Sequence, residues 1–213
     1  MIWGEYAPRV WLQSSASSAY HSVSQELQSL INDAESRRIP ENLVLDKLKE
    51  GAAKRVPPQQ LLQALRTEID RLTIAMQLLQ KGSPVQNAQL ESLLKSLSLL
   101  LQGGVLVDTI DAVIDYAVML EKSSSRAVNA LSSAFRIIAI AQAPAELLRP
   151  LSECLVRSNL SESQFPQLQS FAVRAKSRQV LGENMIKLII GSLDGGYGLV
   201  GLDRELQKRS QRP

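Results

Sequence analysis

The chain has 213 residues, of which 45% are hydrophobic, 21% are charged and 4% are aromatic, and its formal net charge is +3. This composition excludes a largely disordered chain, and its leucine-rich, aromatic-poor character favours helices over sheet. The single cysteine, Cys154, and the single histidine, His21, exclude an internal disulfide framework, a cysteine-based zinc site and any site that needs two imidazoles.

Residues 1–20 show no clear hydrophobic period, and we predict an irregular N-terminal arm. Its aromatic residues, Trp3, Tyr6 and Trp11, are expected to dock on the body of the protein or on a neighbouring copy. Trp3 and Trp11 are therefore candidate partner-binding residues. The first six residues lack the basic region and apolar core of a signal peptide, so we expect either a cytoplasmic chain or the processed form of an exported one.

From about residue 22, apolar residues recur at three- and four-residue steps, which is typical of amphipathic helices. Such stripes need a partner surface, because a short isolated helix is marginal in water. We predict a helical domain over residues 21–193, with helices at about 22–36, 40–54, 58–80, 85–102, 107–121, 124–142, 145–158, 162–178 and 181–192.

The breaks between these stripes are regular. Prolines stand near predicted helix starts, where a missing N–H has no intrahelical partner, and Gly104 and Asn159 stand where a left-handed helix stop is expected. Val56, Val105 and Leu160 each lead such a break, which suggests a degenerate helical-hairpin repeat; any antiparallel helical protein would also give such a self-match. We predict an all-α fold of antiparallel helical hairpins in an irregular bundle or a short α-solenoid.

Residues 194–213 are predicted to be a flexible, basic, glycine-containing tail. The run Gly196–Gly201 matches G-x-G-x-x-G, but a dinucleotide site needs a strand-to-helix turn and a second strand after it. We expect a tail whose Tyr197, Leu199 and Leu202 dock on the body. Its basic residues are expected to be solvated, with weak contact to phosphate or an anionic membrane as the alternative; they are Arg204, Lys208, Arg209 and Arg212.

Three other groups contain side chains that can take part in catalysis or metal binding. Cys154 lies in an apolar stripe, where a free cysteine is usually a small buried hydrophobe rather than a nucleophile. His21, among serines, is expected to cap a helix or face solvent. The carboxylates at positions 108, 111 and 115 share one helix face; two of them suit a helix N-terminus, and cation binding would need further ligands.

The densest charged cluster before the tail contains Lys47, Lys49, Glu50, Lys54 and Arg55. Glu50 and Lys54 are spaced for an ion pair on one helix face. Lys47, Lys54 and Arg55 are candidate partner-binding residues that could face a phosphate. No aromatic residue is interleaved for stacking on bases, so a solvated helix end is the better interpretation.

The segment Lys47–Pro58 contains the pattern E-G-x-A-K-x-V-P-P, followed by the aliphatic run Leu61–Leu65. This pattern resembles a segment of uncharacterised bacterial α-helical proteins, over about residues 39–70. Many members of that group carry export signals, so the resemblance implies a location in the cell envelope. The group has no activity that the resemblance would bring to any residue.

We therefore expect a non-catalytic scaffold or adaptor that binds a protein or peptide on a helical surface, without a cofactor or metal. One alternative is a module that binds nucleic acid or an anionic surface. Another is a small-ligand carrier or enzyme with a pocket between helices. Self-association through the arm is also open. No run of about 18 apolar residues occurs, so no transmembrane helix is predicted.

Overall fold

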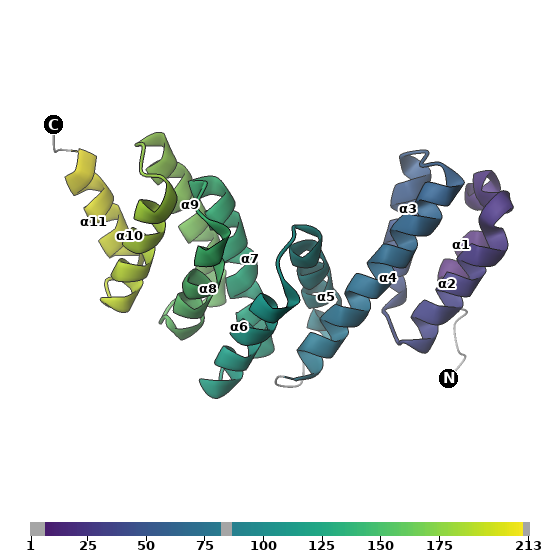
Figure 1. The fold of residues 1–213 in the computed structure, drawn as a ribbon, viewed down its shortest axis with the longest axis horizontal. Helices are drawn as coiled ribbons and strands as arrows, with labels where there is room; N and C mark the ends of the chain where they lie inside the picture. The colour runs from purple at the N-terminus through teal and green to yellow at the C-terminus, as the bar shows by residue number, and fades with distance from the viewer. Residues whose placement is uncertain (1–6, 82–86, 211–213) are drawn as a thin grey trace. The chain divides into compact units, whose positions relative to one another are not determined.

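The computed structural model describes residues 7–81 and 87–210, and within them it contains helices and no strand (Figure 1). The predicted all-α class is confirmed. The α-helices are α1 (Ala7–Leu12), α2 (Ser24–Ser36), α3 (Glu41–Ala53), α4 (Pro58–Gln80), α5 (Asn87–Gln102), α6 (Val107–Met119), α7 (Ser124–Ala141), α8 (Leu148–Arg157), α9 (Phe165–Ser177), α10 (Gly182–Asp194) and α11 (Gly198–Ser210). Short 3₁₀ helices occupy Ser15–Val23, Ala145–Leu147 and Glu162–Gln164. None of the described helices is both long enough and apolar enough to cross a bilayer.

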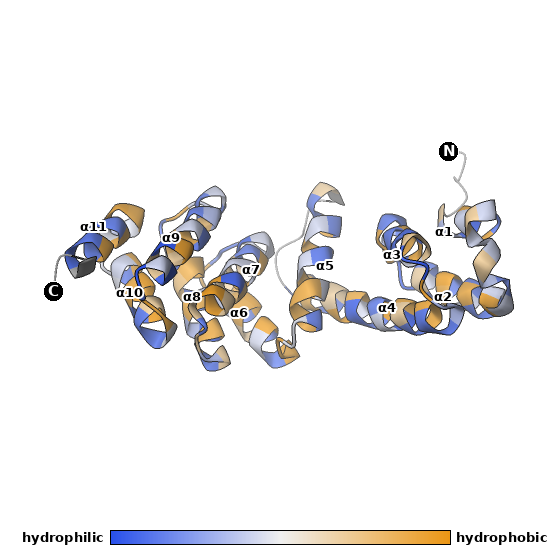
Figure 2. Cartoon of the chain, turned by 90° about the horizontal axis from the view of Figure 1, so that it is seen from above, coloured by the Kyte–Doolittle hydropathy of each residue, from blue (hydrophilic) through white to orange (hydrophobic). Residues whose placement is uncertain are grey.

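The chain forms two compact units. Unit 1 comprises Met1–Gln77 with Leu90–Ser98, and unit 2 comprises Leu78–Gln89 with Leu99–Pro213. Each unit has its own apolar core, and the helices in Figure 2 carry hydrophobic residues on one side and hydrophilic residues on the other. In unit 1, fully buried side chains include Leu27, Ile31, Leu48, Leu61 and Leu65. This burial supplies the partner surface that each amphipathic stripe requires.

The N-terminal segment is ordered, and the prediction of an irregular arm is wrong for its described residues. Residues 7–12 form α1, which packs against α2 and α3. The Ala7 N–H donates a hydrogen bond of 3.0 Å to the Glu41 carboxylate, and Arg9 pairs with Glu35. Only 7% of Trp11 is exposed, so its burial in unit 1 offsets the cost of ordering the segment.

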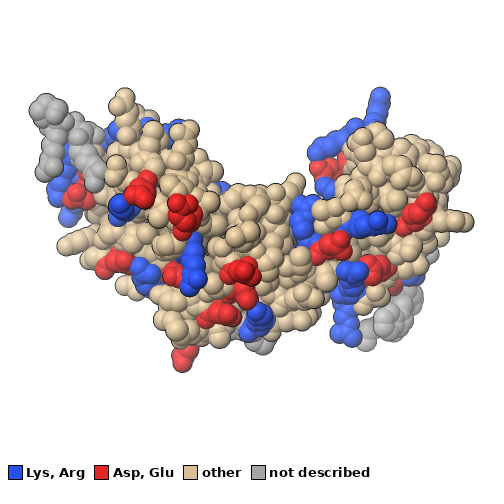
Figure 3. All heavy atoms as spheres, in the orientation of Figure 1, with Lys and Arg blue, Asp and Glu red and all other residues tan. Residues whose placement is uncertain are grey.

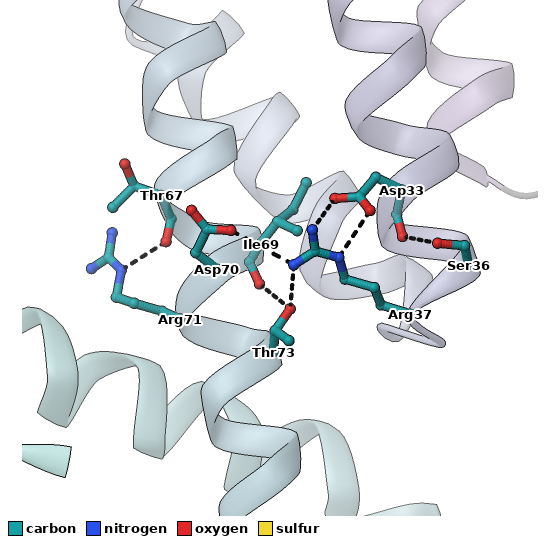
Figure 4. Close-up of polar contacts among 8 residues, drawn as sticks. All are labelled: Asp33, Ser36, Arg37, Thr67, Ile69, Asp70, Arg71 and Thr73. Atoms are coloured by element: carbon teal, nitrogen blue, oxygen red, sulfur yellow. Dashed lines mark hydrogen bonds and ion pairs between the residues drawn. The ribbon is translucent and has the colours of Figure 1, made fainter.

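Polar contacts join α2 to α4 within unit 1 (Figure 4). Arg37, at the C-terminal end of α2, contacts Asp33 through two nitrogens at 2.9 and 2.7 Å. Its Nη1 also donates to the Thr73 hydroxyl on α4 at 3.2 Å and lies 3.7 Å from Asp70. Arg37 is thus held by its own helix and by a neighbouring one, and we interpret it as a structural clamp.

Helix α7 is the centre of unit 2. It packs against α6, α8, α9 and α10, and α11 packs against α9 and α10. Small residues such as Ala127, Ala130 and Ala134 are completely buried on α7. Short side chains at these positions allow neighbouring helices to approach α7 closely from several sides.

Several helix ends in the described chain share one conformation. Five connections have four residues each, at 37–40, 54–57, 103–106, 120–123 and 178–181. In every one, the second residue has a positive φ and the N–H of the third bonds to the carbonyl five residues earlier, at 2.8–3.0 Å. This is the Schellman motif, which satisfies carbonyls left open at a helix end. The left-handed residues are Arg38, Arg55, Gly104, Glu121 and Gln179.

The connection at 158–161 departs from this pattern. Leu160 occupies the third position of this connection, as Val56 and Val105 do in theirs and as the sequence register suggests. Asn159, however, is not among the positive-φ residues of the described chain, so the left-handed helix stop predicted there is wrong. Instead the Arg126 guanidinium on α7 donates to backbone carbonyls at the end of α8. Its acceptors are Leu155 at 3.0 Å, Val156 at 2.7 Å, Ser158 at 2.6 Å and Leu160 at 2.9 Å.

The segment that resembles the bacterial helical proteins forms the connection between α3 and α4. Gly51 lies against Leu61, where an added Cβ would collide with that side chain. Its carbonyl accepts from the Val56 N–H at 2.9 Å and from the Tyr20 hydroxyl at 3.2 Å. Pro58 begins α4, where it displaces no intrahelical hydrogen bond. The pattern in E-G-x-A-K-x-V-P-P therefore has a structural explanation, as a helical corner.

The predicted flexible tail is also ordered over its described part. Residues 198–210 form α11, and its Leu202 and Leu206 are buried. Gly196 has a φ of +74° at the end of α10. A Cβ on Gly201 would collide with Tyr197 and lie 2.9 Å from the Ser192 hydroxyl. The glycine pattern thus lies at a turn between two packed helices. A dinucleotide site would need a turn from a strand to a helix instead.

Candidate functional site

The partner-binding residues predicted from the sequence differ in their surroundings. Trp3 lies outside the described residues, and Trp11 is buried in unit 1. Lys47 and Lys54 both contact Glu50, with Nζ–Oε distances of 3.2 and 2.5 Å. The hydrogen bonds from Lys54 and then Lys47 lower the pKa of Glu50. Arg55 is exposed and supplies the left-handed residue of its connection.

The three carboxylates of α6 do not form a metal site. Lys81 Nζ lies 2.6 Å and 2.7 Å from the two carboxylate oxygens of Asp111. That hydrogen bond, with weaker attraction from Asp111 and Asp115, raises the pKa of Lys81. Across residues 7–81 and 87–210, no group of three or more His, Cys, Asp or Glu side chains is placed to hold a metal.

Cys154 is a buried thiol beside an exposed ion pair. Its Sγ lies 3.6 Å from Asp194 Oδ1, and Arg157 binds the same carboxylate at 2.7 and 2.8 Å. Burial, followed by the negative charge of Asp194, raises the pKa of Cys154 to about 12. The thiol is therefore protonated at neutral pH, whereas an activated cysteine nucleophile is a thiolate with a lowered pKa. His21 lies in unit 1 and is exposed.

A groove lies between α10 and α11 in unit 2. It has a volume of about 540 Å³, within the range of protein ligand sites. In α10 its lining residues follow one helix face, and in α11 they recur at three- and four-residue steps. We call this the α10–α11 groove; it is lined by Lys187, Leu188, Gly191, Ser192, Tyr197, Val200, Gly201, Arg204, Glu205 and Lys208.

The walls of the α10–α11 groove expose large apolar side chains. Tyr197 is 71% exposed and Val200 is 63% exposed. Gly201 permits the close approach of α11 to α10, whereas a Cβ built on Gly191 meets no atom within 4 Å. The missing side chain of Gly191 therefore leaves open space in the groove and is not required for the packing of α10 against α11.

The charge of the groove is unbalanced. Its described lining residues include three cations, Lys187, Arg204 and Lys208, against one carboxylate, Glu205. On the face drawn in Figure 3, by contrast, basic and acidic side chains are interspersed. A local excess of positive charge beside apolar side chains suits an anionic, partly apolar ligand.

Two smaller pockets in unit 2 are less suited to a partner. One, of about 350 Å³, is mostly apolar and lies beside Phe135, Ile138 and Leu148. The other, of about 190 Å³, contains Arg174 and Asp203, whose side chains bind each other at 2.7 Å. Neither combines exposed aromatic surface with unbalanced charge.

The α10–α11 groove was missed in the sequence because its outer wall was assigned to a flexible tail. One signal could have revealed it: Tyr197, Val200, Arg204 and Lys208 follow one another at three- and four-residue steps. The inner wall carries no comparable signal, because Gly191 and Lys187 are ordinary residues of an amphipathic helix.

Comparison with known proteins gives no relative: no family model, curated protein or solved structure matches the chain. The resemblance of residues 39–70 to bacterial helical proteins, and the envelope location that it implies, stay predictions.

Proposed function

We propose that the protein is a non-catalytic helical module that binds a segment of another protein in the α10–α11 groove. The observation that carries this proposal is the exposure of Tyr197 and Val200 beside a groove formed by two packed helices. Helix-in-groove recognition uses such a surface, with apolar anchors of the partner spaced by one helical turn. Aromatic side chains supply much of the binding energy at protein interfaces.

The chemistry of the titratable residues supports a binding role over a catalytic one. The thiol of Cys154 is buried and protonated, and the Asp111 carboxylate is occupied by Lys81. The cations at Lys47 and Lys54 share Glu50. The groove itself offers apolar contact and fixed positive charge, which are the elements of recognition.

Filling the groove should abolish binding without unfolding the protein. Gly191→Leu places a side chain in open space and replaces a helical glycine, which favours the helix by up to about 1 kcal/mol. The control is Ala139→Leu, which adds the same side chain at an exposed position of α7. Peptides would be selected from a randomised helical library on the wild-type protein, and their dissociation constants measured on all three proteins.

We expect Gly191→Leu to weaken the selected peptides at least about tenfold and Ala139→Leu to leave them unchanged. Circular dichroism would show that both variants retain the wild-type helical content. Equal binding by wild type and Gly191→Leu, or a library from which no peptide is enriched, would overturn the proposed function.

A further inference from the structure

We infer that the α10–α11 groove recognises an acidic, amphipathic helical segment, an inference that rests on the proposed function. Apolar side chains of this segment would contact Tyr197 and Val200, and its carboxylates would meet the cations of both walls. The charge of the lining residues is the first observation that points to this chemistry. Lys187 lies on the α10 wall, and Arg204 and Lys208 lie on the α11 wall.

The cations are available to a partner. Arg204 makes no hydrogen bond or ion pair with any residue in the described part of the chain. Lys187 pairs with Glu183 at 2.7 Å, but the two side chains are 69% and 53% exposed. Lys208 pairs with Glu205 at 2.6 Å in a similarly exposed geometry. Exposed pairs of this kind add little to stability, so an incoming carboxylate can replace them at little cost.

The cations and the apolar surface are spaced for a helix. Arg204 and Lys208 are four residues apart, about 6 Å along α11, and Val200 precedes Lys208 by about 12 Å. A partner helix of about eight residues spans that length. It would place an apolar anchor near Val200 and two carboxylates, one turn apart, near Arg204 and Lys208. A guanidinium binds a carboxylate through two parallel hydrogen bonds, so Arg204 should contribute most to the selectivity.

A nucleic acid fits the same groove less well. Three cations could neutralise a few phosphates, but single-strand binding also relies on aromatic side chains on which successive bases stack. Among the described residues that line the groove, Tyr197 is the single aromatic one, and the other apolar side chains are aliphatic. The apolar surface is therefore better matched by leucine-type side chains than by bases.

The test uses the peptides selected on the wild-type protein. We expect them to carry an excess of Asp and Glu, with apolar residues at helical spacing. Arg204→Glu should lower the affinity for an acidic peptide at least about tenfold. A matched peptide in which each Glu is replaced by Lys should bind the Arg204→Glu variant more tightly than it binds the wild type. The control, Arg136→Glu, makes the same change of charge at an exposed position of α7 and should change the affinity less than about twofold.

Each other outcome has a defined consequence. The selected peptides could be neutral and apolar, with their binding abolished by Gly191→Leu but not by Arg204→Glu. That result would overturn the inference of an acidic partner and leave the proposed function in place. Peptides that Gly191→Leu fails to block would overturn the proposed function itself. Tighter binding of an oligothymidine strand than of the acidic peptides, at the same salt concentration, would overturn the inference in favour of a nucleic acid.

Discussion

Arg126→Ala should lower the free energy of unfolding by about 3 kcal/mol, because the substitution leaves several carbonyls at the end of α8 without their donor. The guanidinium also lies 5.4 Å from the centre of the Phe165 ring, and that contact would be lost. Burial lowers the pKa of Arg126, which Glu162 opposes, and the side chain remains charged at neutral pH. Urea unfolding followed by circular dichroism measures the change.

Two matched variants separate this role from the loss of a charge. Arg126→Lys keeps the charge but lacks the planar fork that reaches several carbonyls, so we expect an intermediate loss of stability. Arg136→Ala removes an exposed arginine from the same helix and should change stability by less than about 0.5 kcal/mol. An Arg126→Ala protein as stable as Arg136→Ala would contradict the assigned role.

Trp11→Ala should destabilise unit 1 by about 3 kcal/mol, because a large buried side chain would be replaced by a cavity. The Trp11 ring lies 6.1 Å from that of Tyr20, whose hydroxyl donates to the Gly51 carbonyl on α3. Loss of the indole should therefore loosen the N-terminal segment and its attachment to α3. Hydrogen exchange measured by mass spectrometry would show faster exchange in α1 and α3.

Val10→Ala is the control for Trp11, since Val10 is the preceding residue of α1 and is 48% exposed. We expect that substitution to leave exchange in α3 unchanged. If Trp11→Ala also left stability and exchange unchanged, Trp11 would not be a core residue, and its original assignment to a partner-binding surface would be favoured again.

The central helices could be predicted from the sequence because each is an amphipathic stripe ended by a local signal. Helix α4 runs over 58–80 as predicted, and α7 differs from its prediction by one residue at the C-terminus. Val56 and Val105 were placed in register from the sequence, and both occupy the third position of a Schellman connection. These features depend on residues close together in the chain.

The features that were missed depend on distant contacts. Helix α11 contains glycines and several charges, and its Leu202 and Leu206 are buried against other helices. Arg126 closes the end of α8 from about 30 residues earlier in the chain, so no local pattern could reveal it. The α10–α11 groove lies between these extremes: the spacing of Tyr197, Val200, Arg204 and Lys208 indicates its outer wall, but the inner wall carries no comparable signal.

Hydrogen exchange of the full chain, with and without a peptide selected from the library, tests binding at the α10–α11 groove most directly. Binding at this groove predicts that the peptide slows exchange in α10 and α11 and leaves α3 unchanged. Slowed exchange around Lys47, Lys54 and Arg55 instead, with α10 and α11 unaffected, would contradict it and would favour the charged end of α3 as the binding surface.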